Sequence, residues 1–321
     1  MSATLLLEHA ANANALPIQL RLLRFAQTLD VPIAPTLYIP PELLFETFVV
    51  QTNIAALLRE RTTCASDPAT VSLVEAKVLQ LFKQEQLAAS LARTITATYH
   101  QTLLASFVRL FSTKPIRDKL AQPYENISGD NNLLESVQLV ANELLEQALI
   151  ASRKTNTLVL AAASGICVQT QLQAHNSGTI CSKHPVSPEK NVLTICAQLG
   201  VRSDRVSPTS YDWYKVHQST LQEIAAQIGK KETYYKRATD CVVKTAVAVT
   251  QQHQRILNRE QTTHLARLLQ KISQTTFLSL VIEWEQDKEV LLITQINEQD
   301  MSQTSNNHIS ELEAQRWNAL P

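Results

Sequence analysis

The sequence predicts an α+β fold, in which a helical lobe is followed by a lobe built on a mixed or antiparallel sheet. Apolar residues recur at helical spacing through the first third of the chain, whereas later runs are rich in β-branched residues and separated by short turn sequences. Near the C-terminal end, two aliphatic runs flank a charged turn at Glu285–Glu289, which is the pattern of a β-hairpin. We therefore expect a helical lobe over residues 1–125, a sheet-containing lobe over 126–300 and a polar tail over 301–321.

The helical lobe is expected to start with a helix that follows Pro17 and presents Leu20, Leu23 and Ala26 on one face. The prolines of segment 30–35 end this helix, because proline cannot continue a helix and holds the preceding residue in extended geometry. The other elements expected in this lobe are a short strand and three helices: Leu37–Ile39, Glu42–Arg61, 69–84, and a last helix that ends near Leu110.

The sheet-containing lobe is expected to open with the best-patterned helix of the chain, which follows a turn at Gly129 and runs from Leu133 to Ala148. Five strands are then predicted from β-branched runs: Leu158–Ala162, Ile166–Leu172, Thr179–Ser182, Val192–Ala197 and Trp213–Val216. Residues 218–228 and 238–274 are expected to return to helix before the hairpin, and a short helix is expected at 309–318 in the tail.

The composition excludes several classes of partner. Lysine plus arginine and aspartate plus glutamate number 29 each, so no net charge attracts nucleic acid or anionic lipid. No apolar run reaches the roughly 18 residues that a membrane span needs. The five cysteines are widely spaced and form no Cys-x-x-Cys pair, which favours reduced thiols. We expect a cytoplasmic protein that binds neither nucleic acid nor a membrane.

Three polar residues of the hairpin are the first candidates for a site. Glu283, Gln295 and Asn297 all carry odd numbers, so a turn of odd length places them on one face, because side chains alternate along a strand. A carboxylate and an amide that converge in this way could hold a metal ion and a phosphate. They could equally mark a solvated face, and the residues alone leave both interpretations open.

The text of the hairpin resembles the end of the nucleotide-binding domain of phosphoenolpyruvate synthase and pyruvate phosphate dikinase, an ATP-grasp fold. That family reads Asp-Ile-Glu-Trp, a turn, and Ile-Leu-Gln-Ala-Arg-Pro, where this chain has Val281–Trp284 and Ile293–Glu298. Further similar segments follow in the family's order: Val31–Pro35, Asn126–Gly129, Val168–Gln169, Asn176–Thr179, Leu199–Gly200, Val206–Pro208 and Ile256–Gln261. The resemblance covers roughly residues 16–298 and implies ATP and Mg²⁺ as cofactors, either weakly bound or lost.

The resemblance also implies roles for four residues. Arg109 stands where the family has an arginine that grips nucleotide phosphate, although it could also be an ordinary surface arginine. Glu283 would coordinate Mg²⁺, and Gln295 would supply a neutral ligand beside it. Gln169 would border the nucleotide cleft, although a polar residue on a strand could simply face solvent.

The chain departs from the family at several charged positions. The family's phosphate-binding lysine aligns with Gln19, its metal-binding aspartate with Val281 and its phosphate-binding arginine with Asn297. The polar Ser-Ser-Ala loop becomes Leu110–Ser112, and the glutamate of Gly-Leu-Gly-Glu becomes Val201. The chain holds five glycines, which is little material for loops that cradle phosphate. Phosphoryl transfer depends on such preorganised charges, so these losses predict impaired catalysis.

The preferred interpretation is therefore an ATP-grasp nucleotide-binding domain that stands alone, is catalytically impaired, and serves as a nucleotide-binding or regulatory module. One alternative is an active ATP-dependent phosphotransferase of the pyruvate, water dikinase type, with its phosphohistidine and substrate domains on a separate protein partner. Another is a scaffold that has lost the nucleotide. Glycine poverty and the lost lysine and arginine favour the first and third interpretations over the second.

Overall fold

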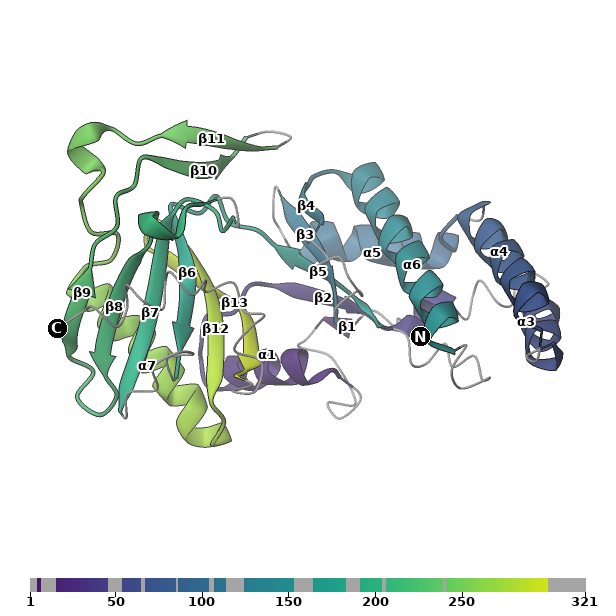
Figure 1. The fold of residues 1–321 in the computed structure, drawn as a ribbon, viewed down its shortest axis with the longest axis horizontal. Coiled ribbons are helices and arrows are strands. Elements are labelled where there is room, and N and C mark those ends of the chain that lie inside the picture. Colours follow the sequence, from purple (N-terminus) through teal and green to yellow (C-terminus); the bar gives the residue numbers. More distant parts are fainter. Residues whose placement is uncertain are drawn as a thin grey trace. The chain divides into compact units, whose positions relative to one another are not determined.

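The computed structural model describes residues 5–6, 16–45, 54–64, 67–84, 86–103, 107–113, 124–152, 164–182, 191–203, 206–238 and 241–299. These residues form helices and antiparallel sheets, which confirms the predicted α+β class (Figure 1). Two compact units divide the chain at other points than residue 125. Unit 1 holds Met1–Ala11 and Pro35–Gln171, and unit 2 holds Asn12–Ala34 and Leu172–Pro321.

Unit 1 is built on a five-stranded antiparallel sheet. In spatial order its strands are β1 (Leu5–Leu6), β2 (Thr36–Ile39), β5 (Ile166–Thr170), β3 (Val108–Ser112) and β4 (Tyr124–Ile127). Helix α6 (Asp130–Ser152) packs against this sheet, and its apolar side joins the core of the unit through residues such as Leu133, Val137 and Leu144. The predicted strand at 37–39 and the predicted helix after Gly129 are thus confirmed.

The remaining helices of unit 1 precede strand β3 in the chain. They are α3 (Ile54–Thr63), α4 (Pro68–Gln84) and α5 (Ala89–Thr98), which continues as a π-helical turn over Tyr99–Leu103. The expected helix Glu42–Arg61 is seen at 41–45 and in α3, with 46–53 outside the described residues. The prediction that the next helix reaches Leu110 is wrong, because Val108–Ser112 is a strand whose backbone pairs with β5 on one side and β4 on the other.

Unit 2 is built on a six-stranded antiparallel sheet whose two faces differ in polarity. In spatial order its strands are β13 (Val290–Glu298), β12 (Leu280–Asp287), β6 (Asn176–Cys181), β7 (Val192–Leu199), β8 (Asp212–His217) and β9 (Glu223–Gln227). Opposed residues across the strands place Ile282, Ile180, Ile195 and Tyr214 on one face, and each of them is at most 1% exposed. The predicted hairpin and the predicted strands near 179, 192 and 213 are confirmed.

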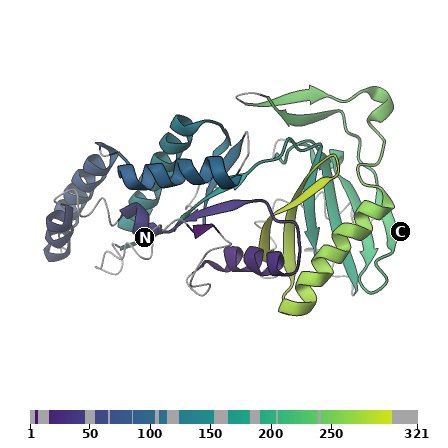
Figure 2. The same cartoon turned by 180° about the vertical axis from the view of Figure 1, so that it is seen from behind.

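Two helices cover unit 2's sheet. Helix α7 (Arg259–Thr276) lies against the sheet (Figure 2). It begins with a capping box between Asn258 and Gln261, and its apolar side is buried. Helix α1 (Ile18–Thr28), predicted from its apolar face, contacts β13. The chain after α1 continues along β13, where the backbone N–H of Ala34 donates to Ile293 at 2.9 Å. Among the described residues, no helix combines the length and the apolar character that a bilayer crossing requires.

The prediction of helix over 218–228 and from 238 to 258 is wrong, because Glu223–Gln227 and Val242–Ala246 form strands. Strand β9 extends the sheet from β8, and β10 (Thr233–Arg237) and β11 (Val242–Ala246) pair with each other as a separate ribbon. Both ribbon strands are rich in aromatic or β-branched residues, which favour extended backbone. Only from Arg259 onward is the predicted helix present. The strand expected at 158–162 and the helix expected at 309–318 lie outside the described residues.

A buried carboxylate holds the base of this ribbon. Asp212 is fully buried and accepts hydrogen bonds from the backbone N–H groups of Gly229 at 2.9 Å and Ile256 at 2.7 Å. It also accepts from the Lys231 ammonium at 2.6 Å and from the Tyr214 hydroxyl at 3.0 Å. Because Gly229 precedes the ribbon and Ile256 follows it, one side chain joins the two ends of the ribbon segment.

Helix α7 ends at a strained residue, which leads to a first prediction. Phe277 has φ 58° and ψ 19°, and 92% of the residue is exposed. The left-handed conformation costs a residue with a Cβ atom about 1–2 kcal/mol, and glycine avoids this cost. Part of the advantage is lost, because glycine has more conformational freedom in the unfolded chain. We expect Phe277→Gly to raise the free energy of unfolding by about 0.5–1 kcal/mol in thermal or denaturant unfolding. Phe277→Ala keeps the Cβ atom and is the control; an equal gain in both variants would contradict the explanation.

Candidate functional site

The hairpin brings two of the predicted site residues face to face. Glu283 on β12 is directly opposite Gln295 on β13, and a bulge follows between Glu283 and Trp284. The next pair on the same face is Val281 opposite Asn297, the two positions where the resembled family has an aspartate and an arginine. The pairing of Glu283 with Gln295 is therefore confirmed, while their roles toward a ligand stay a prediction.

The Glu283–Gln295 pair belongs to a row of side chains that crosses the whole sheet of unit 2. Strand register extends the pair through β6, β7, β8 and β9, and each residue of this row is partly exposed. We call the row the polar row, and its members are Gln295, Glu283, Thr179, Cys196, Trp213 and Gln227. Since directly opposed residues share a face, the polar row lies on the face opposite Ile282 and Tyr214, which we call the open face.

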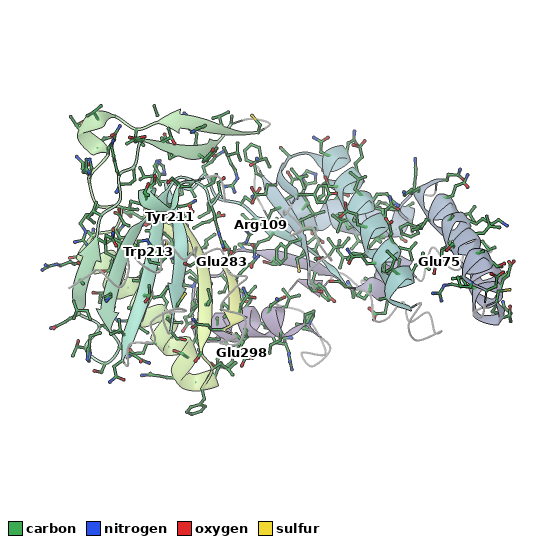
Figure 3. The ribbon with its side chains drawn as sticks, in the orientation of Figure 1. Glu75, Arg109, Tyr211, Trp213, Glu283 and Glu298 are labelled. Atoms are coloured by element: carbon green, nitrogen blue, oxygen red, sulfur yellow. The ribbon has the colours of Figure 1, made fainter. Side chains whose placement is uncertain are left out.

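An arginine that the sequence analysis missed contacts the polar row. The guanidinium of Arg202, in the loop after β7, forms an ion pair with the carboxylate of Glu283 (Figure 3 labels Glu283). The Arg202 side chain is 46% exposed and that of Glu283 is 15% exposed. Glu283 is the main cause that raises the pKa of Arg202, and Tyr211 and Cys196 lie close enough to add to it. Arg202 thus remains a cation over the centre of the row.

A second carboxylate of the open face is also paired. Glu285 is two residues beyond Glu283 on β12 and is almost fully buried. Its Oε1 atom lies 3.8 Å from Nη2 of Arg237 on β10, and its Oε2 atom accepts a hydrogen bond from the backbone N–H of Leu172 at 3.2 Å. Arg237 in turn donates to the carbonyl of Leu172. This pair attaches the ribbon to the end of the open face.

The other two predicted site residues contact each other in unit 1. The Nε and Nη2 atoms of Arg109 donate to Oε1 of Gln169 at 2.9 and 2.6 Å, and Nε2 of Gln169 donates to the Thr36 hydroxyl at 2.8 Å. Arg109 is 5% exposed and Gln169 is fully buried, so neither faces solvent as the alternative interpretations held. The guanidinium also lies over the Phe111 ring, 5.4 Å from its centroid. Within the described part of the chain, no carboxylate lies within ion-pair distance of Arg109.

The four predicted residues thus form two pairs, one in each unit. Arg109 with Gln169 belongs to unit 1, and Glu283 with Gln295 belongs to unit 2. The sequence held one signal for the missed Arg202, since it directly follows Val201, where the family's glutamate is lost. A new charge beside a lost charge can indicate a rearranged site.

Comparison with known proteins gives the class to which this fold and these residues belong. Residues 120–316 match the pyruvate phosphate dikinase AMP/ATP-binding domain family. This match covers more than half of the chain, so the protein belongs to that family, as the sequence resemblance indicated. A stretch of 155 residues is 28% identical to the uncharacterized phosphotransferase YvkC of Bacillus subtilis strain 168. That stretch is 47% of this chain and 18% of YvkC, so the chain spans less than a fifth of this relative's length.

Proposed function

We propose that this protein is a nucleotide-binding module of the ATP-grasp type, whose capacity for phosphoryl transfer is impaired. Membership of an AMP/ATP-binding domain family supports the ligand class. The observation that carries the proposal is the direct opposition of Glu283 and Gln295 on the terminal hairpin, at the two positions that match the family's motif. The open face of unit 2 around this pair offers hydroxyl, amide, aromatic and charged groups to a polar ligand.

Unit 1 supplies a second argument for an anionic ligand. Arg109 is a buried cation whose hydrogen-bond partner Gln169 is neutral. A buried charge is costly unless an opposite charge or several hydrogen bonds compensate it. A phosphate group would supply that compensation, because its oxygens match the two-pronged geometry of a guanidinium. Gln169, held by Thr36, would fix the orientation of the guanidinium for this contact.

Three further positions support impaired catalysis. Val281 and Asn297 stand directly opposite each other beside the Glu283–Gln295 pair, so a carboxylate and a cation of the family pattern are missing at one place. Gln19, at the position of the family's lysine, is partly exposed on α1 and carries no charge. Removing one preorganised electrostatic contact typically costs about 3–4 kcal/mol of transition-state stabilisation. Several such losses together are enough to suppress turnover while leaving a site that binds.

Calorimetric titration with ATP, with and without Mg²⁺, tests this proposal. The wild-type chain is expected to bind ATP, and Glu283→Ala is expected to weaken binding by about tenfold or more. The matched control is Glu298→Ala on the same hairpin, since Glu298 is exposed and opposes Leu280 rather than a polar residue. Equal ATP affinity in wild type and Glu283→Ala would contradict the assignment of Glu283.

The same titration separates the alternatives. Absence of heat from ATP under both conditions would overturn the nucleotide module and favour a scaffold that keeps only the fold. The similarity to YvkC, which is named a phosphotransferase, favours an active phosphotransferase as the second candidate. That candidate predicts transfer of a phosphoryl group of ATP to a phosphohistidine domain.

A further inference from the structure

The carboxylates on the described part of unit 2's open face are paired within the chain. By strand alternation, these carboxylates are Glu283, Glu285 and Asp287, all on β12. Their partners are Arg202, Arg237 and His175, respectively. The carboxylates of the open face are therefore already compensated from within the chain.

This arrangement fits a divalent cation poorly. Mg²⁺ is held by carboxylate and phosphate oxygens in octahedral geometry, and it usually keeps several of its water ligands. Glu283 already binds a guanidinium, Gln295 is neutral, and Val281 offers no oxygen in place of the family's aspartate. In the described part of the chain, no group of three or more histidine, cysteine, aspartate or glutamate side chains is arranged to hold a metal ion. An ion placed against Glu283 would also have to displace, or be repelled by, Arg202.

We propose that Arg202 takes the place of the divalent cation on the open face, so that nucleotide phosphates contact its guanidinium directly and bind without Mg²⁺. This inference rests on the proposed nucleotide binding and adds to it a positive group of unit 2 that contacts phosphate oxygens. A guanidinium has five N–H donors, so it can keep a contact with Glu283 and still offer donors to phosphate oxygens. The 46% exposure of the Arg202 side chain leaves part of it accessible to such a ligand.

The backbone directly before Arg202 is held by close contacts. Gly200 has φ +76°, and a Cβ atom at this position would lie 2.0 Å from the carbonyl oxygen of Tyr235, so only glycine fits without a shift. The N–H of Gly200 donates to the carbonyl of His175 at 2.6 Å, and the N–H of Val201 donates to that of Tyr235 at 2.8 Å. Glu283 then orients the end of the long Arg202 side chain. A cation held in this way loses little further freedom when a phosphate binds.

ATP titrations in excess EDTA and in excess Mg²⁺ test the inference on the full chain. We expect the two conditions to give wild-type affinities that agree within about threefold. Arg202→Gln is expected to lower ATP affinity in EDTA by about tenfold or more, because a charge-assisted contact is lost. Mg²⁺ should restore part of that affinity in Arg202→Gln only, since Glu283 is then released. Arg202→Lys keeps the charge and should stay independent of Mg²⁺.

Arg267→Gln is the matched control, because Arg267 is an exposed arginine on α7, the helix that covers the sheet's other face. It should bind ATP like the wild type in both conditions. Unchanged thermal unfolding and circular dichroism of Arg202→Gln would show that its loss of affinity is local. A wild-type affinity that falls about tenfold or more in EDTA would overturn the role of Arg202 while leaving nucleotide binding intact.

A titration with Mn²⁺ alone, followed by electron paramagnetic resonance, decides the matter without nucleotide. We expect wild type to show no bound ion that depends on Glu283, and Arg202→Gln to gain one that disappears in Arg202→Gln/Glu283→Gln. A wild-type ion that is lost in Glu283→Gln would overturn the inference, as would no gain in Arg202→Gln. If ATP binds under neither condition, the proposed function fails, and the Mn²⁺ result alone supports or overturns the replacement of the metal by Arg202.

Discussion

Asp212→Asn is expected to lower the free energy of unfolding by about 3–5 kcal/mol, because removal of one partner from a buried ion pair leaves the other charge uncompensated. Lys231, which is 2% exposed, would lose its carboxylate. The amide group of asparagine would also direct N–H donors toward positions where the ammonium and the backbone N–H groups of Gly229 and Ile256 already donate. The loss would concentrate where the ribbon joins the sheet.

Hydrogen exchange of backbone amides measures this effect locally, because protection in residues 229–257 reports opening of the ribbon segment. Glu232→Gln is the matched control: Glu232 pairs with Lys230 on the surface of the same segment, with 64% of its side chain exposed. That variant should keep the wild-type unfolding temperature and protection pattern. Wild-type protection of Gly229 and Ile256 in Asp212→Asn would show that the carboxylate does not hold the ribbon.

Glu75→Ala is expected to cost about 3–5 kcal/mol of unfolding free energy in unit 1, for a related reason. Nε of Arg61 lies 2.9 Å from Oε1 of Glu75, both side chains are at most 4% exposed, and Nη2 of Arg61 donates to the carbonyl of Leu149 at 3.3 Å. This pair joins α3, α4 and α6 in the helical part of unit 1 (Figure 3 labels Glu75). Without Glu75, the buried guanidinium of Arg61 keeps its hydrogen bond to the Leu149 carbonyl but loses the carboxylate that balanced its charge.

A double variant separates the value of the pair from the cost of an orphaned charge. Arg61→Met with Glu75→Leu removes both charges and fills a similar volume, so its stability should return to within about 1–2 kcal/mol of wild type or exceed it. Glu60→Ala on the exposed side of α3 controls for the loss of a glutamate. Chemical denaturation followed by circular dichroism gives the comparison. A double variant as unstable as Glu75→Ala would mean that packing at these positions, rather than buried charge, determines the loss.

The sequence predicted the elements whose side-chain pattern is strong and local. The hairpin was readable because Glu283 and Gln295 interrupt long aliphatic runs at matching positions, and α1 because Leu20, Leu23 and Ala26 follow helical spacing. Strands β9, β10 and β11 were missed because short mixed runs fit either period, and pairing with β8 or with each other decides between them.

The candidate site was predictable only where it follows a motif. Arg202 pairs with a residue far along the chain, and no local pattern announces a contact that depends on two strands and a loop. The burial of Arg109 and Gln169 was also hidden from the sequence, because β5 is enclosed between β2 and β3 on both edges and that order is set by tertiary packing.

The path of the chain between the units has a consequence for dissecting the protein. Helix α1 and the segment after it belong to unit 2, where Pro32 and Ala34 exchange backbone hydrogen bonds with Ile293, although residues 35–171 intervene in the sequence. A fragment trimmed to the family match at 120–316 would therefore lack the cover of β13's outer edge. Its unpaired N–H and C=O groups would recruit other strands, so such a fragment would self-associate. Soluble expression of the C-terminal half calls for the N-terminal helix to be supplied with it, as a fused or co-expressed peptide.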